Sequence, residues 1–393
     1  MKKKILLAVN TALVNSTGGV EHVLCNMANE MQRRGFDLFV ATMEDKEGRP
    51  FFPLDPGIHF KNLYPDFARQ SKIVQKVLAF LLKLRGRKKL KKFYFKSIVW
   101  QKFIRSIRPD LVIAFSLPTL WEMTCAGKIK TCATILTVHG NPVNDYTDRF
   151  WPRPRYMNEE LRKIYQNADV IQVLLDGYKP FVPNEYRGKV AVIGNVAPFI
   201  STGDEREPSE PHKIVCVARL CPEKHQDLLI KAFAGISSDF PQWTVDFYGE
   251  GPLRDEYAQL IAKLGMARRI FLKGTVKAPQ DVLRKASLFV LPSRVEGFPL
   301  VLAEAMGLGL PCIGLTCCDG TNEIIQHQKS GLLANDDEDA LAAAMRQLMG
   351  DEDLRKQYGR AGCQQMQRYS AERIWNQWED LIRTTIKTFD NNK

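Results

Sequence analysis

Residues Arg294–Glu304 read Arg-Val-Glu-Gly-Phe-Pro-Leu-Val-Leu-Ala-Glu, and this stretch decides the fold of the chain. It follows a short apolar run, Leu288–Pro292, which has the pattern of a buried strand in a parallel sheet. Gly297 and Pro299 then predict a turn, and the helix formers of Leu300–Met306 predict a helix directly after it. The first amides of such a helix have no partner within the helix, so the sequence predicts a strand–turn–helix unit whose turn can bind an anion.

Two carboxylates bracket this turn. Glu296 lies in the turn itself, and Glu304 lies about one turn into the helix, among Val, Leu, Ala and Met residues. A carboxylate in an apolar setting needs a partner, because an unpaired buried charge is costly. A sugar or ribose diol that donates two hydroxyls would be such a partner. The spacing by itself also allows a solvated Glu296 and a Glu304 paired with a basic neighbour.

Strand and helix patterns alternate along both halves of the 393-residue chain. A polar, Pro-containing linker at Ser201–Pro211 separates the halves, and each half is long enough for its own core. Alternation of this kind implies parallel sheets with right-handed crossovers. The acidic run Asp336–Asp339 is predicted to cap a helix at Ala340–Met349. The pattern ends in a predicted helix at Ser370–Phe389. The predicted strands are Ile5–Val9, Leu38–Met43, Ile58–Leu63, Asp110–Ser116, Thr134–Val138, Val170–Leu174, Lys189–Ile193, Lys213–Ala218, Val245–Tyr248, Ile270–Leu272, Leu288–Pro292 and Pro311–Leu315.

Two cations follow the predicted strand Lys213–Ala218. The chain continues as Arg219-Leu-Cys-Pro-Glu-Lys224, at the carboxyl end of a strand, where α/β sheets bind ligands. Two cations in one loop suit a phosphate group, although Arg219 could also pair with a nearby acid.

In the first half, His139 follows the strand Thr134–Val138, where a lone histidine is also compatible with a structural role. Gly18 and Gly19 precede a predicted helix, Val20–Arg34. That layout suits a phosphate, but it also occurs as a plain tight turn.

These segments resemble glycosyltransferase family 4, whose members are retaining enzymes with the two-domain GT-B fold. The resemblance covers the whole chain and is most specific over Lys213–Asn335. It implies that Glu296 contacts the donor sugar, that Glu304 binds the nucleotide ribose, and that Arg219 and Lys224 hold the diphosphate. Two positions depart from the family pattern: His225 stands where Asn or Gly is common, and Asp319-Gly320 stands where Gly-Gly is common. The other implied site residues are His139 against the donor sugar, Gly18 and Gly19 facing the diphosphate and the acceptor, Gly297 and Phe298 in the nucleotide-sugar site, and Gly249 and Val276 near the base.

The implied architecture is α/β, with two Rossmann-like domains that face a central cleft. Residues 1–200 would bind the acceptor, residues 212–369 would bind the nucleotide sugar, and residues 370–393 would form a helix that packs back on the first domain. The implied reaction moves a hexosyl or N-acetylhexosaminyl group with retention, and UDP is favoured over GDP. The departing phosphate would serve as the base, stabilised by fixed cations. No Asp-x-Asp lies in a loop at the end of one of the predicted strands, so neither a metal nor a cofactor is expected.

The net charge of +12 comes from one segment. Arg69–Arg108 contains fourteen Lys and Arg residues and no acid, and the rest of the chain is close to neutral. Apolar and aromatic residues recur at helical spacing over Lys72–Ile107, which predicts a basic amphipathic helix. Such a helix suits an anionic membrane surface or the diphosphate of a lipid-linked acceptor. A solvated basic helix is the alternative, and no nucleic-acid recognition motif is present.

The expected acceptor is therefore a polyprenyl-diphosphate-linked saccharide, as in bacterial enzymes of lipid-linked oligosaccharide and surface-polysaccharide biosynthesis. No apolar run approaches the roughly 18–20 residues that span a bilayer, and the nine cysteines have no metal-binding spacing. A cytoplasmic protein bound peripherally to the inner face of the plasma membrane fits these features. Two alternatives remain. An epimerase of the same fold would need no acceptor, and a non-catalytic nucleotide-sugar-binding protein would more readily have lost Arg219, Lys224 or Glu304.

Overall fold

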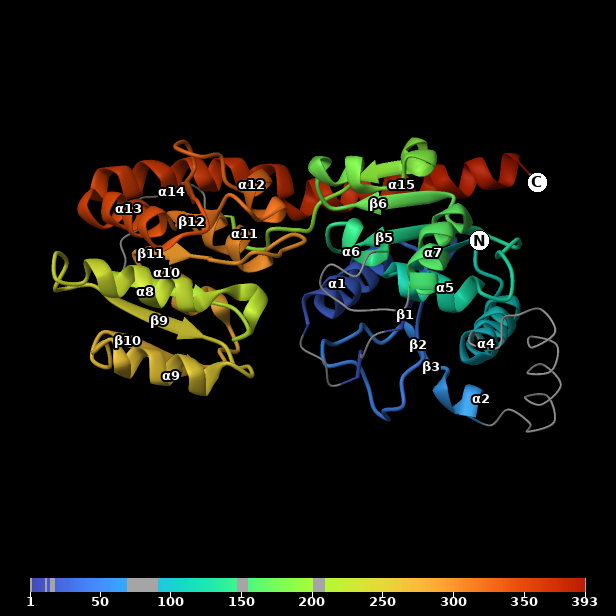
Figure 1. Ribbon diagram of the computed structural model, residues 1–393. Coiled ribbons are helices and arrows are strands. Elements are labelled where there is room, and N and C mark those ends of the chain that lie inside the picture. Colours follow the sequence, from blue (N-terminus) through green and yellow to red (C-terminus); the bar gives the residue numbers. More distant parts are fainter. Residues whose placement is uncertain are drawn as a thin grey trace. The chain divides into compact units, whose positions relative to one another are not determined.

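The computed structural model describes residues 2–10, 13–14, 18–68, 91–146, 155–200 and 209–392. The chain divides into two compact units (Figure 1). Unit 1 comprises Met1–Ile193 together with Trp375–Lys393, and unit 2 comprises Gly194–Ile374. Each unit contains one parallel sheet with helices around it, so the predicted α/β fold is confirmed.

The sheet of unit 1 has seven strands in the order β3-β2-β1-β4-β5-β6-β7, and all its pairs are parallel. Strand β4 is buried along its whole length, which explains its unbroken apolar sequence. The chain order reverses between β1 and β4, and α/β sheets bind ligands at the carboxyl ends of strands beside such a point. The strands are β1 (Lys4–Val9), β2 (Asp37–Thr42), β3 (His59–Asn62), β4 (Leu111–Ala114), β5 (Ala133–Val138), β6 (Val170–Val173) and β7 (Val190–Val192).

The helices of unit 1 follow the strands as crossover connections. The first of them begins at Gly19, with Gly18 as its N-cap, and buries Leu24, Ala28 and Met31 at helical spacing. The α-helices within unit 1 are α1 (Gly19–Arg33), α2 (Tyr64–Ala68), α4 (Lys91–Ile107), α5 (Leu117–Thr124), α6 (Val143–Tyr146) and α7 (Arg155–Ile164), and the 3₁₀ turns are η2 (Tyr165–Asn167), η3 (Asp176–Phe181) and η4 (Asn184–Lys189).

Only the last part of the predicted basic helix, α4, lies within the described residues, whereas residues 69–90 lie outside them. Helix α4 packs against α5 in part through a stacked pair of rings, Phe93 and Trp121, whose centroids are 4.2 Å apart. The Lys96 ammonium lies 2.6 Å from the Glu122 carboxylate, and the two side chains are only 14% and 5% exposed. Lys96 is therefore neutralised inside unit 1. The prediction that the cations of Arg69–Arg108 have no acidic partners is therefore wrong for Lys96, because Glu122 belongs to a different helix.

The C-terminal helix α15, Ala371–Asn391, belongs to unit 1 from Trp375 onward. Its apolar residues recur every four positions, which forms one buried stripe along the helix. The buried side chains of this stripe are Trp378, Ile382 and Ile386.

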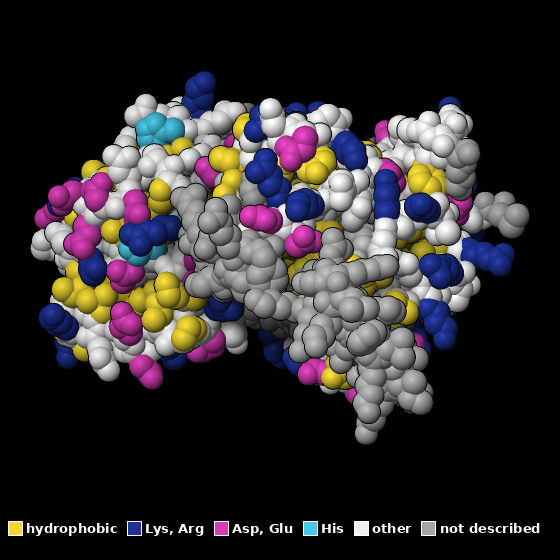
Figure 2. Space-filling view, turned by 45° about the vertical axis from the view of Figure 1, so that its right-hand side comes forward, with side chains coloured by type: hydrophobic (Ala, Val, Ile, Leu, Met, Phe, Trp, Pro, Cys, Tyr) yellow, Lys and Arg dark blue, Asp and Glu magenta, His cyan; other side chains and the backbone are white. Residues whose placement is uncertain are grey.

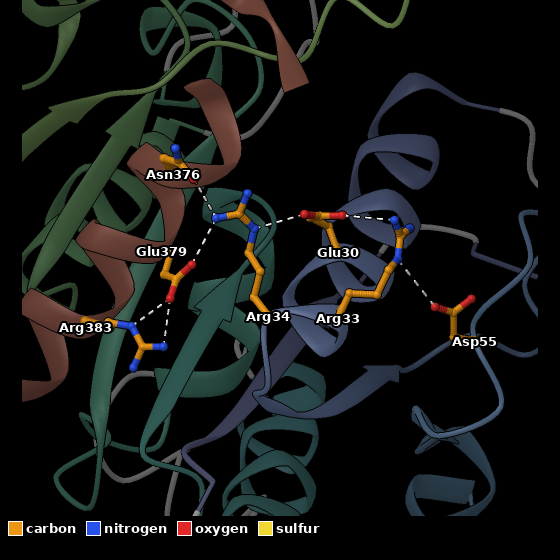
Figure 3. Close-up of polar contacts among 7 residues, drawn as sticks. All are labelled: Glu30, Arg33, Arg34, Asp55, Asn376, Glu379 and Arg383. Atoms are coloured by element: carbon orange, nitrogen blue, oxygen red, sulfur yellow. Dashed lines mark hydrogen bonds and ion pairs between the residues drawn. The ribbon is translucent and has the colours of Figure 1, made fainter. Parts of the chain in front are cut away.

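A polar network links α15 to the end of α1 (Figure 3). The Arg34 guanidinium lies 2.9 Å from the Glu30 carboxylate and 2.9 Å from the Glu379 carboxylate, and it donates a hydrogen bond of 2.7 Å to Asn376. On the other side, Glu379 also binds Arg383 at 2.7 Å. Because Arg34 is 19% exposed and engages several partners, this network is a stronger connection than an isolated surface ion pair.

The sheet of unit 2 has six parallel strands in the order β10-β9-β8-β11-β12-β13. Strands β8 and β11 are direct neighbours at the centre, so the segments that follow them leave the same edge of the sheet side by side. The strands are β8 (Lys213–Val217), β9 (Thr244–Tyr248), β10 (Ile270–Gly274), β11 (Leu288–Val290), β12 (Cys312–Leu315) and β13 (Leu332–Ala334).

Helices cover both faces of this sheet (Figure 1). Helix α13 begins after Asp337, whose side chain accepts a hydrogen bond of 2.8 Å from the amide of Ala340, so the predicted acidic cap is confirmed. The α-helices are α8 (Gln226–Ile236), α9 (Arg254–Lys263), α10 (Pro279–Lys285), α11 (Leu300–Gly307), α12 (Asp319–Ile324), α13 (Glu338–Gly350) and α14 (Glu352–Met366), and the 3₁₀ turns are η5 (Pro222–Lys224) and η6 (Gln367–Tyr369).

The boundary between the units lies before the expected linker at residues 201–211. Gly194 is already packed in unit 2, where a Cβ atom would collide with the ring of Tyr369. The amide of Ala197 donates a hydrogen bond of 2.9 Å to the carbonyl of Tyr369. These contacts fix the chain to unit 2 from Gly194 onward, and no polarity pattern in the sequence indicates them.

On the face seen in Figure 2, Lys and Arg side chains lie among Asp and Glu side chains. This distribution agrees with the near-neutral charge of the chain outside the basic segment.

Candidate functional site

The carboxyl ends of β8 and β11 bring together the two motifs that the sequence singles out. The Lys224 ammonium, in η5, lies 2.6 Å from the Glu296 carboxylate, in the loop after β11. These side chains are 21% and 13% exposed. The amide of Arg294 also donates a hydrogen bond of 3.0 Å to the carbonyl of Glu223, which joins the two loops through their backbones. The pair of loops is therefore a preformed unit with one cation and one carboxylate in close contact.

Arg219 lies in the same loop as Lys224 but is far more open. Its side chain is 65% exposed, and its guanidinium lies 3.4 Å from Glu223. An exposed pair of this kind contributes little to stability, so Arg219 can exchange Glu223 for a phosphate at small cost. Arg219, whose pair with Glu223 is exposed, and Lys224, whose ammonium contacts Glu296, are two cations in one loop that suit a diphosphate.

Glu304 is the most unusual carboxylate of this region. It lies in α11, between the buried residues Ala303 and Ala305. Burial raises the pKa of Glu304 from 4.5 to about 7. Within the described ranges, no hydrogen bond or ion pair reaches its carboxylate, so the alternative of a basic neighbour finds no support there. A half-buried carboxylate without a protein partner suits a ligand that donates hydroxyls.

The turn that precedes Glu304 supplies backbone rather than side chains. Helix α11 has Pro299 as its N-cap, without a side-chain cap. Gly297 is partly buried in the same turn. The Phe298 ring is 6% exposed and packs edge-to-face on Tyr369, with centroids 4.9 Å apart. The Phe298 ring is therefore packed within unit 2.

Gly249 and Val276 follow the strands β9 and β10, which are adjacent in the sheet. Gly249 has φ +146°, and a Cβ atom there would collide with the carbonyl oxygen of Ala218. The amide of Leu220 donates a hydrogen bond of 3.0 Å to the carbonyl of Glu250, which ties this loop to the one that carries Arg219. The close approach of the Ala218 carbonyl therefore explains why position 249 is a glycine. Val276 is partly buried in the loop before α10 and makes no polar contribution.

His225 has a backbone explanation for its departure from the family pattern. Its φ and ψ are 50° and 40°, in the left-handed region, and it is the N-cap of α8. That region favours Gly and tolerates Asn and His better than most other residues. Asn and Gly, which are common at this position in the family, also adopt the left-handed conformation readily.

The remaining predicted residues lie in unit 1, at the carboxyl edge of its own sheet. His139 follows β5, with Nε2 2.8 Å from the Thr137 hydroxyl and its ring stacked on Phe115 at 5.2 Å. Burial lowers the pKa of His139 to about 4, so the imidazole is neutral at pH 7. The neutral imidazole of His139 can exchange hydrogen bonds with sugar hydroxyls without adding charge.

Gly18 and Gly19 form the start of α1, as the sequence predicts.

Sequence reasoning missed a polar cluster at the same edge. Asn10 follows β1, and its side-chain oxygen accepts a hydrogen bond of 2.9 Å from Thr119. Ser116 follows β4 with φ 143°, a conformation that L-residues rarely adopt, and its hydroxyl accepts from the amide of Thr119. The available signal was Ser116 directly before Leu117-Pro118, because a Ser at the N-cap and a Pro in the first turn are typical of a helix start.

Among the described residues, no group of three or more His, Cys, Asp or Glu side chains could hold a metal ion. Among the helices of the described ranges, none has the length and apolarity that a bilayer crossing requires.

Comparison with known proteins gives two family matches that follow each other along the chain. Residues 17–195 match glycosyltransferase family 4, and residues 201–365 match glycosyl transferases group 1. Among relatives, the amylovoran biosynthesis glycosyltransferase AmsD of Erwinia amylovora is 21% identical over 96% of this chain and 99% of that protein. A Campylobacter jejuni α-1,4-N-acetyl-D-galactosaminyltransferase that acts on an undecaprenol-linked saccharide is 23% identical over 94% of this chain and 96% of that protein. An exopolysaccharide phosphotransferase of Streptomyces coelicolor is 37% identical, but over only 45% of this chain and 19% of that protein.

Solved structures give the same picture of the fold. Sucrose-phosphate synthase from Thermosynechococcus elongatus superposes with a TM-score of 0.80 at 18% identity, over 98% of this chain and all of that chain. A TarM variant from S. aureus, in complex with Fondaparinux, α-GlcNAc-glycerol and UDP, has a TM-score of 0.76 at 17% identity, over 97% and 99% of the two chains. These similarities confirm the predicted GT-B fold. Because the two family matches together span most of its length, the chain belongs to the glycosyltransferases, with a family 4 domain followed by a group 1 domain.

Proposed function

We propose that this glycosyltransferase moves a hexosyl or N-acetylhexosaminyl group from a UDP-sugar to a lipid-linked saccharide during polysaccharide biosynthesis, with retention of configuration. The observation that carries the proposal is the contact between Lys224 and Glu296, together with the exposed Arg219 and with Glu304, which has no partner among the described residues. These four side chains can bind the three parts of a nucleotide sugar that carry charge or hydroxyls: the diphosphate, the sugar and the ribose.

Each residue has a role that its surroundings support. Arg219 and Lys224 bind the diphosphate and stabilise the charge that develops on it as the sugar leaves. Glu296, released from Lys224 by the phosphate, accepts hydroxyls of the donor sugar. Glu304 accepts the two ribose hydroxyls, which gives its half-buried carboxylate the partner it lacks in the described chain.

The reaction requires no nucleophile from the protein. The bond between the anomeric carbon and the diphosphate oxygen breaks, and the acceptor hydroxyl oxygen bonds to the same face of the sugar. The proton of that hydroxyl passes to the departing diphosphate oxygen, and UDP leaves. Since Arg219 and Lys224 neutralise the diphosphate, the proposal includes no metal ion and no cofactor.

The acceptor part of the proposal is supported by relatives and by helix α4. The Campylobacter relative acts on an undecaprenol-linked saccharide, and the Erwinia relative serves amylovoran biosynthesis. Along α4 and at its end, Lys102, Arg105 and Arg108 are exposed, and Ile98 is 40% exposed on the same helix. Cations beside an exposed apolar side chain suit an anionic membrane surface. We therefore place the protein peripherally at the inner face of the plasma membrane.

The experiment that tests the proposed function is a transfer assay with radiolabelled nucleotide sugars and a membrane lipid extract. The expected result is label in the lipid-linked fraction that depends on both donor and acceptor, from the wild type and from Lys263→Ala, an exposed lysine on α9, but not from Lys224→Ala. An epimerised nucleotide sugar formed without any acceptor would instead support an epimerase. Binding of nucleotide sugars without turnover would support a non-catalytic protein.

A further inference from the structure

The loop after β13 carries a carboxylate that contacts both motif loops. Asp336 lies two residues after the end of β13, and its side chain is 26% exposed. The Arg294 guanidinium donates two hydrogen bonds to it, from Nε to Oδ2 at 2.7 Å and from Nη2 to Oδ1 at 3.3 Å. His225 approaches Oδ1 with Nδ1 at 3.1 Å, without the alignment of a hydrogen bond. One carboxylate therefore connects three loops that leave three different strands.

The two residues that contact Asp336 each adjoin a residue of the proposed donor site. His225 directly follows Lys224, and Arg294 lies two residues before Glu296. The amide of Arg294 is also bound to the carbonyl of Glu223, next to Lys224 in the chain. Asp336 therefore contacts both of the loops that carry Lys224 and Glu296.

The contact between Lys224 and Glu296 cannot by itself keep this geometry during the reaction. A diphosphate that binds Lys224 and a sugar that binds Glu296 both compete with the contact of 2.6 Å between the two side chains. The contacts of Asp336 with Arg294 and His225 involve neither of these side chains, so they persist with the donor bound. Catalysis depends on such fixed positions, because a displacement of about 1 Å can cost up to 10²-fold in rate.

We infer that Asp336 is a positioning residue, which, through Arg294 and His225, holds Lys224 and Glu296 at the separation that the donor diphosphate and sugar require. This inference rests on the proposed function. The role is one of geometry rather than stability, since partly exposed ion pairs contribute little to folding.

Steady-state kinetics of Asp336→Asn test this positioning role, with the neighbouring variant Asp337→Ala as the matched control. Asp337 is an adjacent carboxylate that caps α13 and contacts neither loop, so its loss should lower the melting temperature and leave kcat unchanged. Asp336→Asn should lower kcat about tenfold at saturating donor, with KM for the donor changed less than threefold and the melting temperature nearly unchanged. A wild-type kcat for Asp336→Asn, or a fall in kcat that Asp337→Ala reproduces, would overturn the inference.

Substitutions at His225 separate the backbone from the side chain. His225→Asn and His225→Gly both keep a residue that tolerates the left-handed conformation. If the side-chain contact matters, both variants lower kcat, and combining His225→Asn with Asp336→Asn gives less than the product of the two effects. If only the backbone matters, both variants have wild-type kcat, which contradicts the role of the His225 side chain.

Hydrogen exchange gives a readout that needs no substrate. In the nucleotide-free protein, Asp336→Asn should speed amide exchange in residues 219–226 and 293–299, whereas Asp337→Ala should not. Unchanged exchange in either segment would contradict the inference even if no transfer reaction is found. Faster exchange in both segments without any transfer activity of the wild type would support the loop contacts and contradict the proposed function.

Discussion

Replacing Glu304 by Gln should stabilise the nucleotide-free protein above neutral pH. The carboxylate is half-buried without a partner in the described chain, and burial raises its pKa from 4.5 to about 7. Ionising such a group in the folded state is a cost that the unfolded chain does not have. Gln keeps nearly the same shape and has no charge, so the variant removes that cost.

The size of the effect follows from the displacement of the pKa. At about 1.4 kcal/mol per pKa unit, a change from 4.5 to about 7 corresponds to at most about 3–4 kcal/mol above pH 7. Below about pH 4.5 the carboxyl is protonated in both states, and the cost vanishes. Between about pH 4.5 and 7 the folded state binds more protons than the unfolded state, so the stability of the wild type falls as pH rises. The variant has no such titration.

Thermal melts without nucleotide measure this difference. Unit 2 is of a size for which 1 kcal/mol shifts the melting temperature by about 2–4 °C, so the variant should melt several degrees above the wild type near pH 8 and close to it near pH 5. Glu256→Gln, an exposed carboxylate on α9, serves as the matched control and should show no pH-dependent difference. Saturating UDP should reverse the order, because only the wild type gains the ribose contact. A Glu304→Gln protein that melts at or below the wild type near pH 8 would mean that Glu304 has a stabilising protein partner.

Three further predictions concern other parts of the molecule. Arg219→Ala should lower kcat about 10²–10³-fold at saturating donor. Arg268→Ala, which removes an exposed arginine after α9, is the control and should keep wild-type turnover. Near-normal turnover of Arg219→Ala would contradict the assignment of Arg219 to the phosphate. Replacing Lys102, Arg105 and Arg108 by Ser should weaken sedimentation with anionic liposomes by about 1 kcal/mol per cation, with unchanged UDP binding as the control. Equal sedimentation of variant and wild type would mean that this face of α4 is only solvated. Activity should persist in EDTA, and a loss that added Mg²⁺ restores would contradict the assignment of diphosphate charge to Arg219 and Lys224.

The sequence indicated the local units of the site well. The strand Leu288–Val290 and the helix Leu300–Gly307 have simple signals, an apolar run and a turn followed by helix formers, and both lie within two residues of their predicted bounds. The left-handed backbone of His225 was not predicted, because histidine has no strong preference for it.

Contacts between distant segments were harder to predict. The approach of Lys224 to Glu296 depends on β8 and β11 being neighbours, which the order of strands along the chain does not reveal. Lys96 was grouped with free cations because its partner Glu122 lies outside the basic segment. Asp336 was interpreted only as part of an acidic cap, since its contacts with Arg294 and His225 require three loops to meet. In each case the missing information was which strands or helices pack together.

The most direct test of the donor site is a calorimetric titration of UDP into the wild type, Lys224→Ala and Lys263→Ala. We expect UDP to bind the wild type and Lys263→Ala equally. Lys224→Ala should bind UDP at least about tenfold more weakly, because it loses a charge-assisted contact to the diphosphate. Equal affinity for UDP in all three proteins would contradict the assignment of this site to the nucleotide sugar.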